Sequence, residues 1–279
     1  MTASSDPSLA LSGKFAFEED TAVEARDKDN FIANITDRWS IDGRPNGGYL
    51  MSTVLAALSQ RLSHPDPLAS TGHFLSPAEP GPSEIRISVI KEGRSFSTAH
   101  AALSQNGRDR VVVLATFGDL TQAGVTRTAD DAPTHHEELI SSNGRPIHSP
   151  ITERFEVELP PAQGRAALGR PDDYEGPAEF TGRISFSDGM PSTAIAFPLI
   201  VDAFPPTVWR LGLVGWTPTL ELTVYTRRRP APGPLTMRVR SNHIINGLVE
   251  EDGELWDQTG ALVGQSRQLS KIIVKEPAS

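Results

Sequence analysis

The chain repeats one structural unit, and this repetition limits its possible folds more than any single motif does. In the first half, an apolar pattern with helical spacing covers Tyr49–Leu62 and follows a glycine-rich turn. A strand is predicted near Phe15, and three further strand-like runs follow the helix: Ser83–Glu92, Ser95–Ser104 and Arg110–Phe117. The pair Asn106-Gly107 between the last two runs is typical of a hairpin turn. This half is therefore predicted to be a helix followed by an antiparallel meander.

The second half has the same order of elements. A helical segment is predicted over Met190–Leu213, with a break at Pro205-Pro206, because proline lacks an N–H donor and its ring clashes with the preceding turn. The predicted strands are Arg154–Leu159, Thr219–Thr226, Leu235–Ile245, Leu248–Asp257 and Ala261–Ile273. A second hairpin signal, Asn246-Gly247, lies between two of these strands.

The two halves are predicted to be fused copies of one α+β module. A sheet wrapped round a single helix would leave one face of each meander uncovered, so we expect the modules to pack side by side in one continuous antiparallel sheet. The predicted boundaries are a flexible N-terminal segment at residues 1–13, a first module at 14–118, a linker at 119–149 and a second module at 150–279. The linker is rich in Thr, Asp, Pro, His and Ser and has little periodicity.

Composition excludes several classes of function. The formal net charge of −9 gives no electrostatic reason to expect a nucleic acid partner. The chain has no cysteine, which excludes disulfides, thiolate metal ligands and a cysteine nucleophile. No segment approaches the roughly 20 apolar residues that span a bilayer, and the N-terminus has no basic leader. We therefore expect a cytoplasmic protein without a membrane span.

Polar side chains interrupt the strands of the second module, where a sheet built only for stability has little use for them. They occur in Thr219-Leu-Glu-Leu-Thr223 and in Gly264-Gln-Ser-Arg-Gln268. The corresponding run of the first module, Val111-Val-Val-Leu-Ala115, is apolar. Only the second module can therefore hold a hydroxyl and an amide on neighbouring strands, which indicates a site.

An ordered set of short motifs resembles the type II acyl-CoA thioesterases, which have a double hot-dog fold. The N-terminal motifs are Pro45-Asn-Gly-Gly48, His73-Phe-Leu-Ser-Pro77, Lys91-Glu-Gly-Arg-Ser-Phe96 and Ser104-Gln-Asn-Gly107. The C-terminal ones are Asp202, Thr219-Leu-Glu-Leu-Thr223, Arg228-Arg-Pro230, Gly260-Ala-Leu-Val263 and Gln268. The resemblance implies hydrolysis of an acyl-CoA to a free fatty acid and CoA, a place in fatty acid metabolism, and no metal or other cofactor. We also expect a homo-oligomer.

On that resemblance, Asp202, Thr219 and Gln268 are predicted to be catalytic. Asp202 can accept a proton from water or orient it, Thr219 can donate and accept a hydrogen bond, and the amide of Gln268 can hold the water from its other side. Gly47 and Gly48 open a helix, where backbone N–H groups lack intrahelical partners, so they are predicted to stabilise the oxyanion.

Further residues are expected to contact the substrate or to compete for a role. Arg94, Ser95 and Arg228 are predicted to bind substrate. The guanidinium of Arg228 suits the phosphates of CoA, and an equal alternative is that Arg228 is only a solvent-exposed residue at the end of a strand. Gln265 is the alternative to Gln268, and a separation of three residues places the two on opposite faces of a strand.

Two departures from the family pattern keep other functions open. Glu221 and Leu222 stand where many relatives carry an aspartate and a histidine. The first alternative is a non-catalytic acyl-CoA or lipid-binding protein on the same scaffold. The second is a hydratase or dehydratase, which needs a histidine and an aspartate facing the substrate, and no predicted helix offers a histidine beside its glycine-rich start.

Overall fold

The structure is a computed structural model, and it describes residues 15–122, 124–134, 136–142, 149–171 and 174–273. The N-terminal segment predicted to be flexible lies outside these ranges. The prediction of a strand near Phe15 is wrong, because a short helix α1 (Ala16–Asp20) begins there. The Asp188 carboxylate accepts a hydrogen bond from the Ala16 N–H at 3.0 Å, and acidic residues in the first turn favour a helix start.

The first module consists of a sheet and one long helix. The helix α2 (Gly47–Arg61) begins after Asn46, whose side chain accepts a hydrogen bond from the Tyr49 N–H at 3.0 Å and so caps it. The strands are β1 (Val23–Ala25), β2 (Asn30–Ile35), β5 (Asp66–Phe74), β6 (Gly81–Glu92), β7 (Ser97–Gln105) and β8 (Arg108–Gly118). A small hairpin, β3 (Ser40–Ile41) and β4 (Arg44–Pro45), precedes α2.

The second module has the same plan with a shorter central helix. The helix α4 (Phe197–Ala203) lies between two 3-10 helices, η3 (Ala194–Ala196) and η4 (Thr207–Leu211), so the predicted helical segment is interrupted at Pro205-Pro206 as expected. Its strands are β9 (Ile140–Ser141), β10 (Phe155–Leu159), β11 (Ala178–Phe186), β12 (Thr219–Thr226), β13 (Leu235–Ser241), β14 (Ile244–Ile245), β15 (Leu248–Trp256) and β16 (Leu262–Lys271). A 3-10 helix η2 (Pro150–Arg154) and a helix α3 (Pro161–Ala167) complete the module.

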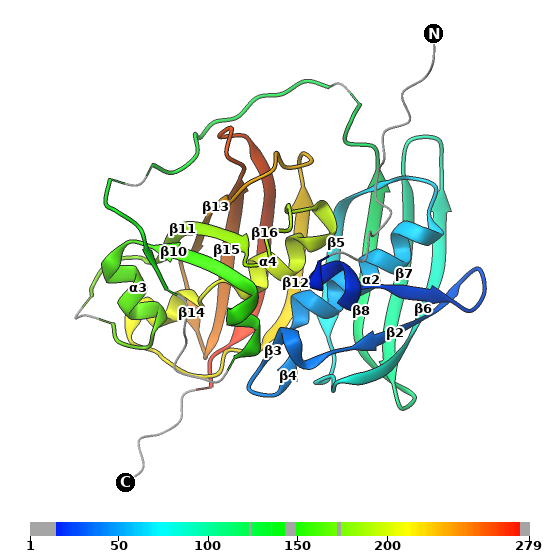
Figure 1. The fold of residues 1–279 in the computed structure, drawn as a ribbon, viewed down its shortest axis with the longest axis horizontal. Coiled ribbons are helices and arrows are strands. Elements are labelled where there is room, and N and C mark those ends of the chain that lie inside the picture. Colours follow the sequence, from blue (N-terminus) through cyan, green and yellow to red (C-terminus); the bar gives the residue numbers. More distant parts are fainter. Residues whose placement is uncertain (1–14, 123, 135, 143–148, 172–173, 274–279) are drawn as a thin grey trace.

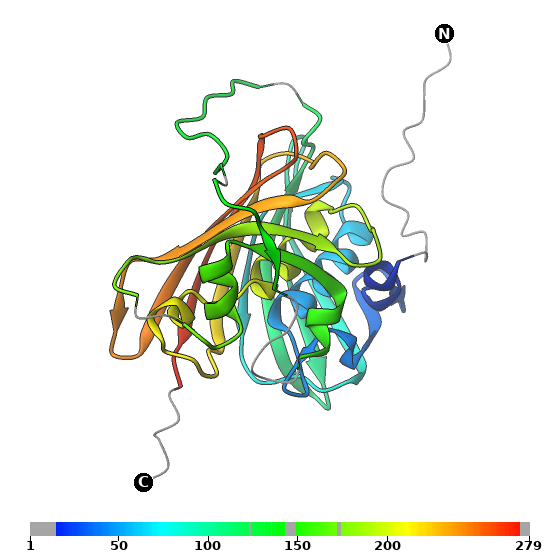
Figure 2. The ribbon, with the colours of Figure 1, turned by 60° about the vertical axis from the view of Figure 1, so that its left-hand side comes forward.

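The two modules share one 14-stranded sheet in the order β1-β2-β6-β7-β8-β5-β12-β16-β15-β13-β11-β10-β9, with β14 paired to β15. The modules join where β5 pairs antiparallel with β12, from Ala69 opposite Tyr225 to His73 opposite Glu221. Figure 1 shows α2 and α4 in the centre of the molecule, and Figure 2 shows the sheet bending around them. The predicted double hot-dog α+β fold is therefore confirmed. The predicted module boundaries stay a prediction, and β9, inside the predicted linker, adds an edge strand by pairing with β10.

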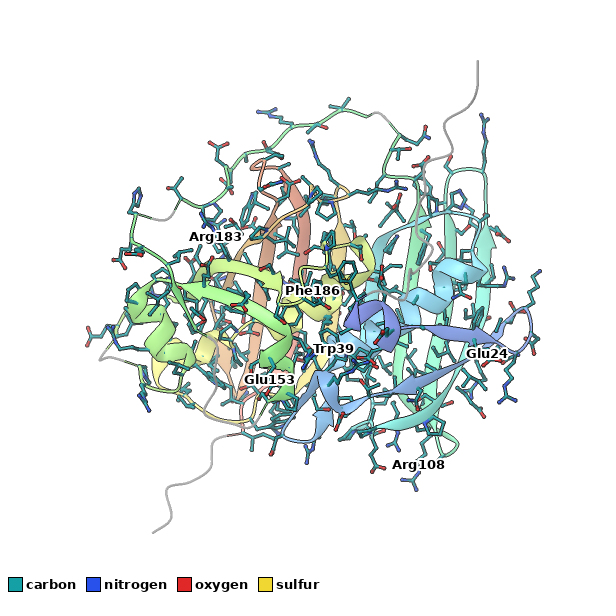
Figure 3. All side chains as sticks on the ribbon, in the orientation of Figure 1. Glu24, Trp39, Arg108, Glu153, Arg183 and Phe186 are labelled. Carbon is teal, nitrogen blue, oxygen red and sulfur yellow. The ribbon has the colours of Figure 1, made fainter. Side chains whose placement is uncertain are left out.

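The central helices touch each other, and this contact depends on glycine. A Cβ atom on Gly48 would lie 2.2 Å from the carbonyl oxygen of Pro198, so no larger residue fits between α2 and α4. A second contact between the modules is an aromatic cluster, in which Trp39 lies 6.0 Å from Phe155 and 6.2 Å from Phe186 between ring centroids. Figure 3 labels Trp39 and Phe186, which lie in the centre where the modules meet.

One stretch, Ala194–Leu211, is long and apolar enough by composition to cross a membrane. Within the protein 83% of it is buried, and it is divided among η3, α4 and η4. Its apolar character is that of the core of the second module.

Candidate functional site

A cavity of about 280 Å³ lies between the modules, where the N-terminal end of α2 meets the C-terminal end of α4. Most of its lining is apolar, and it includes Ile41, Leu50, Phe74, Val201, Phe204, Trp209, Trp216 and Leu220. The charged side chains that line it, among the residues described, are Arg44, Asp202 and Glu251. An apolar cavity with a few polar groups gathered at one place is the usual form of a small-molecule site.

The carboxylate of Asp202 is held by both modules. Its Oδ2 accepts a hydrogen bond from the Gly48 N–H at 2.9 Å, and its Oδ1 accepts one from the Thr219 hydroxyl at 3.2 Å. The side chain of Asn46, which caps α2, donates to the backbone carbonyl of Asp202 at 3.2 Å. A carboxylate at the first turn of a helix is stabilised by the positive end of the helix dipole. Asp202 therefore has a fixed orientation at the edge of the cavity.

Thr219 reaches the cavity because β12 contains a bulge. In a regular strand Thr219 would share a face with Glu221, since side chains alternate. The register shifts between these two residues, so that Thr219 lies opposite Ser270 while Glu221 lies opposite Leu269. Ser270 is buried on the inner face of the sheet. The bulge thus turns Thr219 inward toward Asp202.

Gln268 lines the cavity, and Gln265 does not. Gln268 lies opposite Leu222 on one side and Glu251 on the other, both of them buried inner-face residues. Gln265 lies opposite Tyr225 on the outer face. The structure therefore brings Asp202, Thr219 and Gln268 together around one cavity, and their catalytic roles stay a prediction.

Glu251 is a site residue that the sequence reasoning missed. It is 5% exposed, and its Oε1 accepts a hydrogen bond from the Thr207 N–H at 2.6 Å, while Nε2 of Gln268 donates to its Oε2. Burial raises the pKa of Glu251, the hydrogen bonds from Thr207 and Gln268 oppose this shift, and the nearby charge of Asp202 adds to it. A signal was present, because Glu251 occupies an inward position in the alternation of Val249, Glu251 and Leu255.

The two glycines at the start of α2 have different roles. The N–H of Gly48 is bound to the Asp202 carboxylate, so it is not available to an oxyanion in this arrangement. Gly47 lines the cavity, and within the described part of the chain its N–H forms no hydrogen bond. Of the two predicted oxyanion donors, Gly47 is thus the one whose N–H is available.

The other predicted substrate contacts lie away from the cavity. Arg94 and Ser95 are exposed in the turn between β6 and β7, and Arg228 is exposed after the end of β12. None of the three lines the cavity. The cation that does so is Arg44, an exposed residue of β4 whose guanidinium lies 5.4 Å from the ring centroid of Trp216. The sequence reasoning missed Arg44, because nothing in its neighbourhood indicates that β4 borders a cavity.

The substituted family positions lie on opposite faces of β12. Leu222 is fully buried beside Gln268, whereas Glu221 accepts a hydrogen bond from the Thr223 hydroxyl at 2.5 Å on the outer face. Across the described ranges, no three His, Cys, Asp or Glu side chains gather in a group that could hold a metal ion.

Comparisons with known proteins identify the same family over both halves of the chain. The family model of the acyl-CoA thioesterase N-terminal domain matches residues 35–118, and that of the C-terminal domain matches residues 124–272. An uncharacterized protein of Mycobacterium tuberculosis is 27% identical over 274 residues, with 87% of this chain and 90% of that protein covered.

Solved structures give the same result for the fold. A Thermobifida fusca protein provisionally named a thioesterase II is 30% identical, with a TM-score of 0.82 over 92% of this chain and 97% of that one. The acyl-CoA thioesterase II TesB2 of Mycobacterium marinum has a TM-score of 0.74 over 94% of this chain and 99% of that one. At 17% identity, this second likeness concerns the fold alone.

Proposed function

Because the chain belongs to the acyl-CoA thioesterase family, we propose that it hydrolyses an acyl-CoA thioester to a free carboxylic acid and CoA by metal-free activation of water. The observation that carries the proposal is the position of the Asp202 carboxylate. It is fixed by Gly48 and Thr219 at the edge of an apolar cavity that Gln268 also lines.

The proposed reaction follows from these groups. A water held between Asp202 and Gln268 attacks the thioester carbonyl, and Asp202 accepts the proton that the water loses. The carbonyl oxygen gains negative charge and is stabilised by the N–H of Gly47. When the tetrahedral intermediate collapses, the carbon–sulfur bond breaks, the leaving thiolate takes the proton from Asp202, and the acid and CoA leave with Asp202 restored as a carboxylate.

The size of the cavity favours a short or compact acyl group. Its volume of about 280 Å³ lies just below the range of roughly 300–1,000 Å³ that is common for ligand pockets. Its wall contains two bulky tryptophans, Trp209 and Trp216. We propose that Arg44 meets the phosphates of CoA outside the cavity, because guanidinium pairs well with phosphate. A cytoplasmic location and a homo-oligomeric state remain proposals from the sequence.

The alternatives differ in what the cavity contains. A hydratase needs a histidine facing the substrate, and none of the described residues that line the cavity is a histidine. A non-catalytic acyl-CoA binder would use the same apolar wall, so that only a measurement of turnover separates it from an enzyme.

The test is release of free CoA from a panel of acyl-CoAs of increasing chain length. A thiol reagent reports the product, and the protein does not consume it because it has no cysteine. The matched variants are Gln268→Ala and Gln265→Ala, on the same strand but on opposite faces. We expect wild type to hydrolyse the shorter members, Gln265→Ala to match it, and Gln268→Ala to lose at least about tenfold in kcat. Tight binding without hydrolysis across the whole panel would refute the proposal and establish a binder.

A further inference from the structure

The side-chain amide of Gln268 has two orientations that differ in chemistry. With Nε2 turned toward β15, its Oε1 faces the cavity and accepts a hydrogen bond from water. If the amide is rotated by 180°, its NH₂ group, which can only donate, faces the cavity in place of Oε1. An attacking water needs its protons drawn away and its lone pair left free for the carbonyl carbon. The orientation with Oε1 toward the cavity therefore suits hydrolysis.

The neighbour that decides the orientation is Glu251, which lies directly opposite Gln268 in the ladder between β15 and β16. Its Oε2 accepts the hydrogen bond from Nε2 of Gln268. Its Oε1 is held by the backbone N–H of Thr207, the first residue of η4. The carboxyl group thus cannot rotate away, because one of its oxygens is tied to the main chain.

Glu251 offers an acceptor to Gln268 even when it carries a proton. Its Oε1 lies 2.7 Å from the Thr207 hydroxyl oxygen, which lies 2.6 Å from that of Ser241, and this in turn lies 2.5 Å from the carbonyl oxygen of Glu250. The carbonyl can only accept, so the Ser241 hydroxyl donates to it, and the Thr207 hydroxyl donates to Oε1 of Glu251. Burial raises the pKa of Glu251. If Oε1 takes up a proton, the Thr207 hydroxyl can accept it and turn its own proton toward Ser241, so that Oε2 still accepts from Gln268.

We infer that Glu251 is a positioning residue, which holds the amide of Gln268 with its oxygen toward the cavity so that it accepts a hydrogen bond from the attacking water. This inference rests on the proposed function. Among the described residues, Asp202 and Arg44 are the other charged groups that line the same cavity, and Glu251 acts through Gln268 rather than on the substrate.

The substitution Glu251→Gln tests this role with almost no change of shape. The fixed N–H of Thr207 still requires an oxygen, so the new amide turns its NH₂ toward Gln268. The amide of Gln268 must then turn over and place its own NH₂ in the cavity. We expect kcat to fall at least about tenfold, or 1.4 kcal/mol, with KM retained and the protein still folded.

A control and a rescue separate positioning from general damage. Glu250→Gln changes the adjacent carboxylate, whose Oε1 accepts hydrogen bonds from the N–H groups of Asn242 and His243 at the surface, and should leave kcat unchanged. In the double variant Glu251→Gln/Gln268→Glu, the carboxylate at 268 accepts from the amide at 251 and still presents its other oxygen to the cavity, so that part of kcat should return. Wild-type kcat in Glu251→Gln, or a loss matched by an equal loss in Glu250→Gln, would overturn the inference.

A measurement without turnover keeps this inference distinct from the proposed function. In protein labelled with ¹⁵N-glutamine, the NH₂ signal of Gln268 is identified by its absence in Gln268→Glu. We expect Glu251→Gln to displace this signal and Glu250→Gln to leave it in place. If wild type hydrolyses no acyl-CoA, the proposed function fails, and the signal still reports on the amide. If wild type is active but the signal does not move in Glu251→Gln, only the positioning role fails.

Discussion

Replacing Asp202 by asparagine removes the proposed base and keeps nearly everything else. The oxygen of the new amide can accept from the Gly48 N–H, which now lies 2.9 Å from the carboxylate. Its NH₂ group then faces the Thr219 hydroxyl, which can turn and accept, since a hydroxyl both donates and accepts. Both partners stay satisfied, and the change exchanges charged for neutral hydrogen bonds, so we expect the free energy of unfolding to change by about 1 kcal/mol or less.

The expected loss of activity is much larger than this structural cost. General base catalysis contributes about 10²–10⁴ in rate, so kcat should fall by that factor. Each factor of ten corresponds to about 1.4 kcal/mol in the barrier. Affinity for a non-hydrolysable thioether analogue of acyl-CoA should change little, because the acyl group is held mainly by apolar burial.

Three measurements decide this prediction: kcat from CoA release, affinity for the analogue by calorimetry, and Tm. Glu221→Gln is the control, because it removes a carboxylate from the outer face of the same region. Wild-type kcat in Asp202→Asn would refute the role of Asp202 as base. A fall in kcat that merely follows a fall in Tm would assign Asp202 to stability instead.

Four further outcomes are expected. Arg44→Gln should raise KM for acyl-CoA and leave it unchanged for an acyl thioester of N-acetylcysteamine, which lacks phosphates; equal effects on both would remove Arg44 from phosphate binding. Gly48→Ala should destabilise the protein by about 1–3 kcal/mol in denaturant unfolding, because its methyl group meets the backbone of Pro198, and an unchanged midpoint would disprove this contact. Phe186→Ala should cost about 3–5 kcal/mol by the same assay, since Phe186 is 4% exposed in the aromatic cluster, and a cost under 1 kcal/mol would contradict that packing. Burial raises the pKa of Glu251 above its ordinary value of 4.5, so the stabilising contribution of this group is present below pH 4.5 and is lost as pH rises through the folded-state pKa. The Tm of Glu251→Gln relative to wild type should therefore increase as pH rises from 4.5, and a difference that stays constant with pH would contradict the raised pKa.

Local signals in the sequence were sufficient for many elements of the fold. Both Asn-Gly hairpins form with positive φ angles, at Asn106 and Gly107 and again at Asn246 and Gly247. The proline pair ends α4 as predicted, because its effect needs no tertiary contact. The ordered motifs indicated the fold, and they predicted the grouping of Asp202, Thr219 and Gln268, which line one cavity in the structure.

The remaining features depend on contacts that a single sequence does not display. The strands β5 and β11 were not predicted, since Asp66–Phe74 and Ala178–Phe186 both contain glycine in place of a regular apolar pattern. The bulge in β12 decides which way Thr219 points, and only pairing with β16 reveals it. The role of Gly48 was predicted as an oxyanion donor, but its N–H is bound by a carboxylate from the other module.

The covalent joining of two hot-dog modules has a consequence for how this site can change during evolution. In a symmetric dimer every substitution appears twice, once at each of two equivalent places, so a residue must suit both. Here the contact between Gly48 and Pro198, and that between Gly48 and Asp202, each occur once per chain. The first module accordingly has a largely apolar β8, while the second carries Glu251 and Gln268. Fusion thus allows the two modules to carry different residues. Each chain holds one copy of each module, and the site needs residues from both.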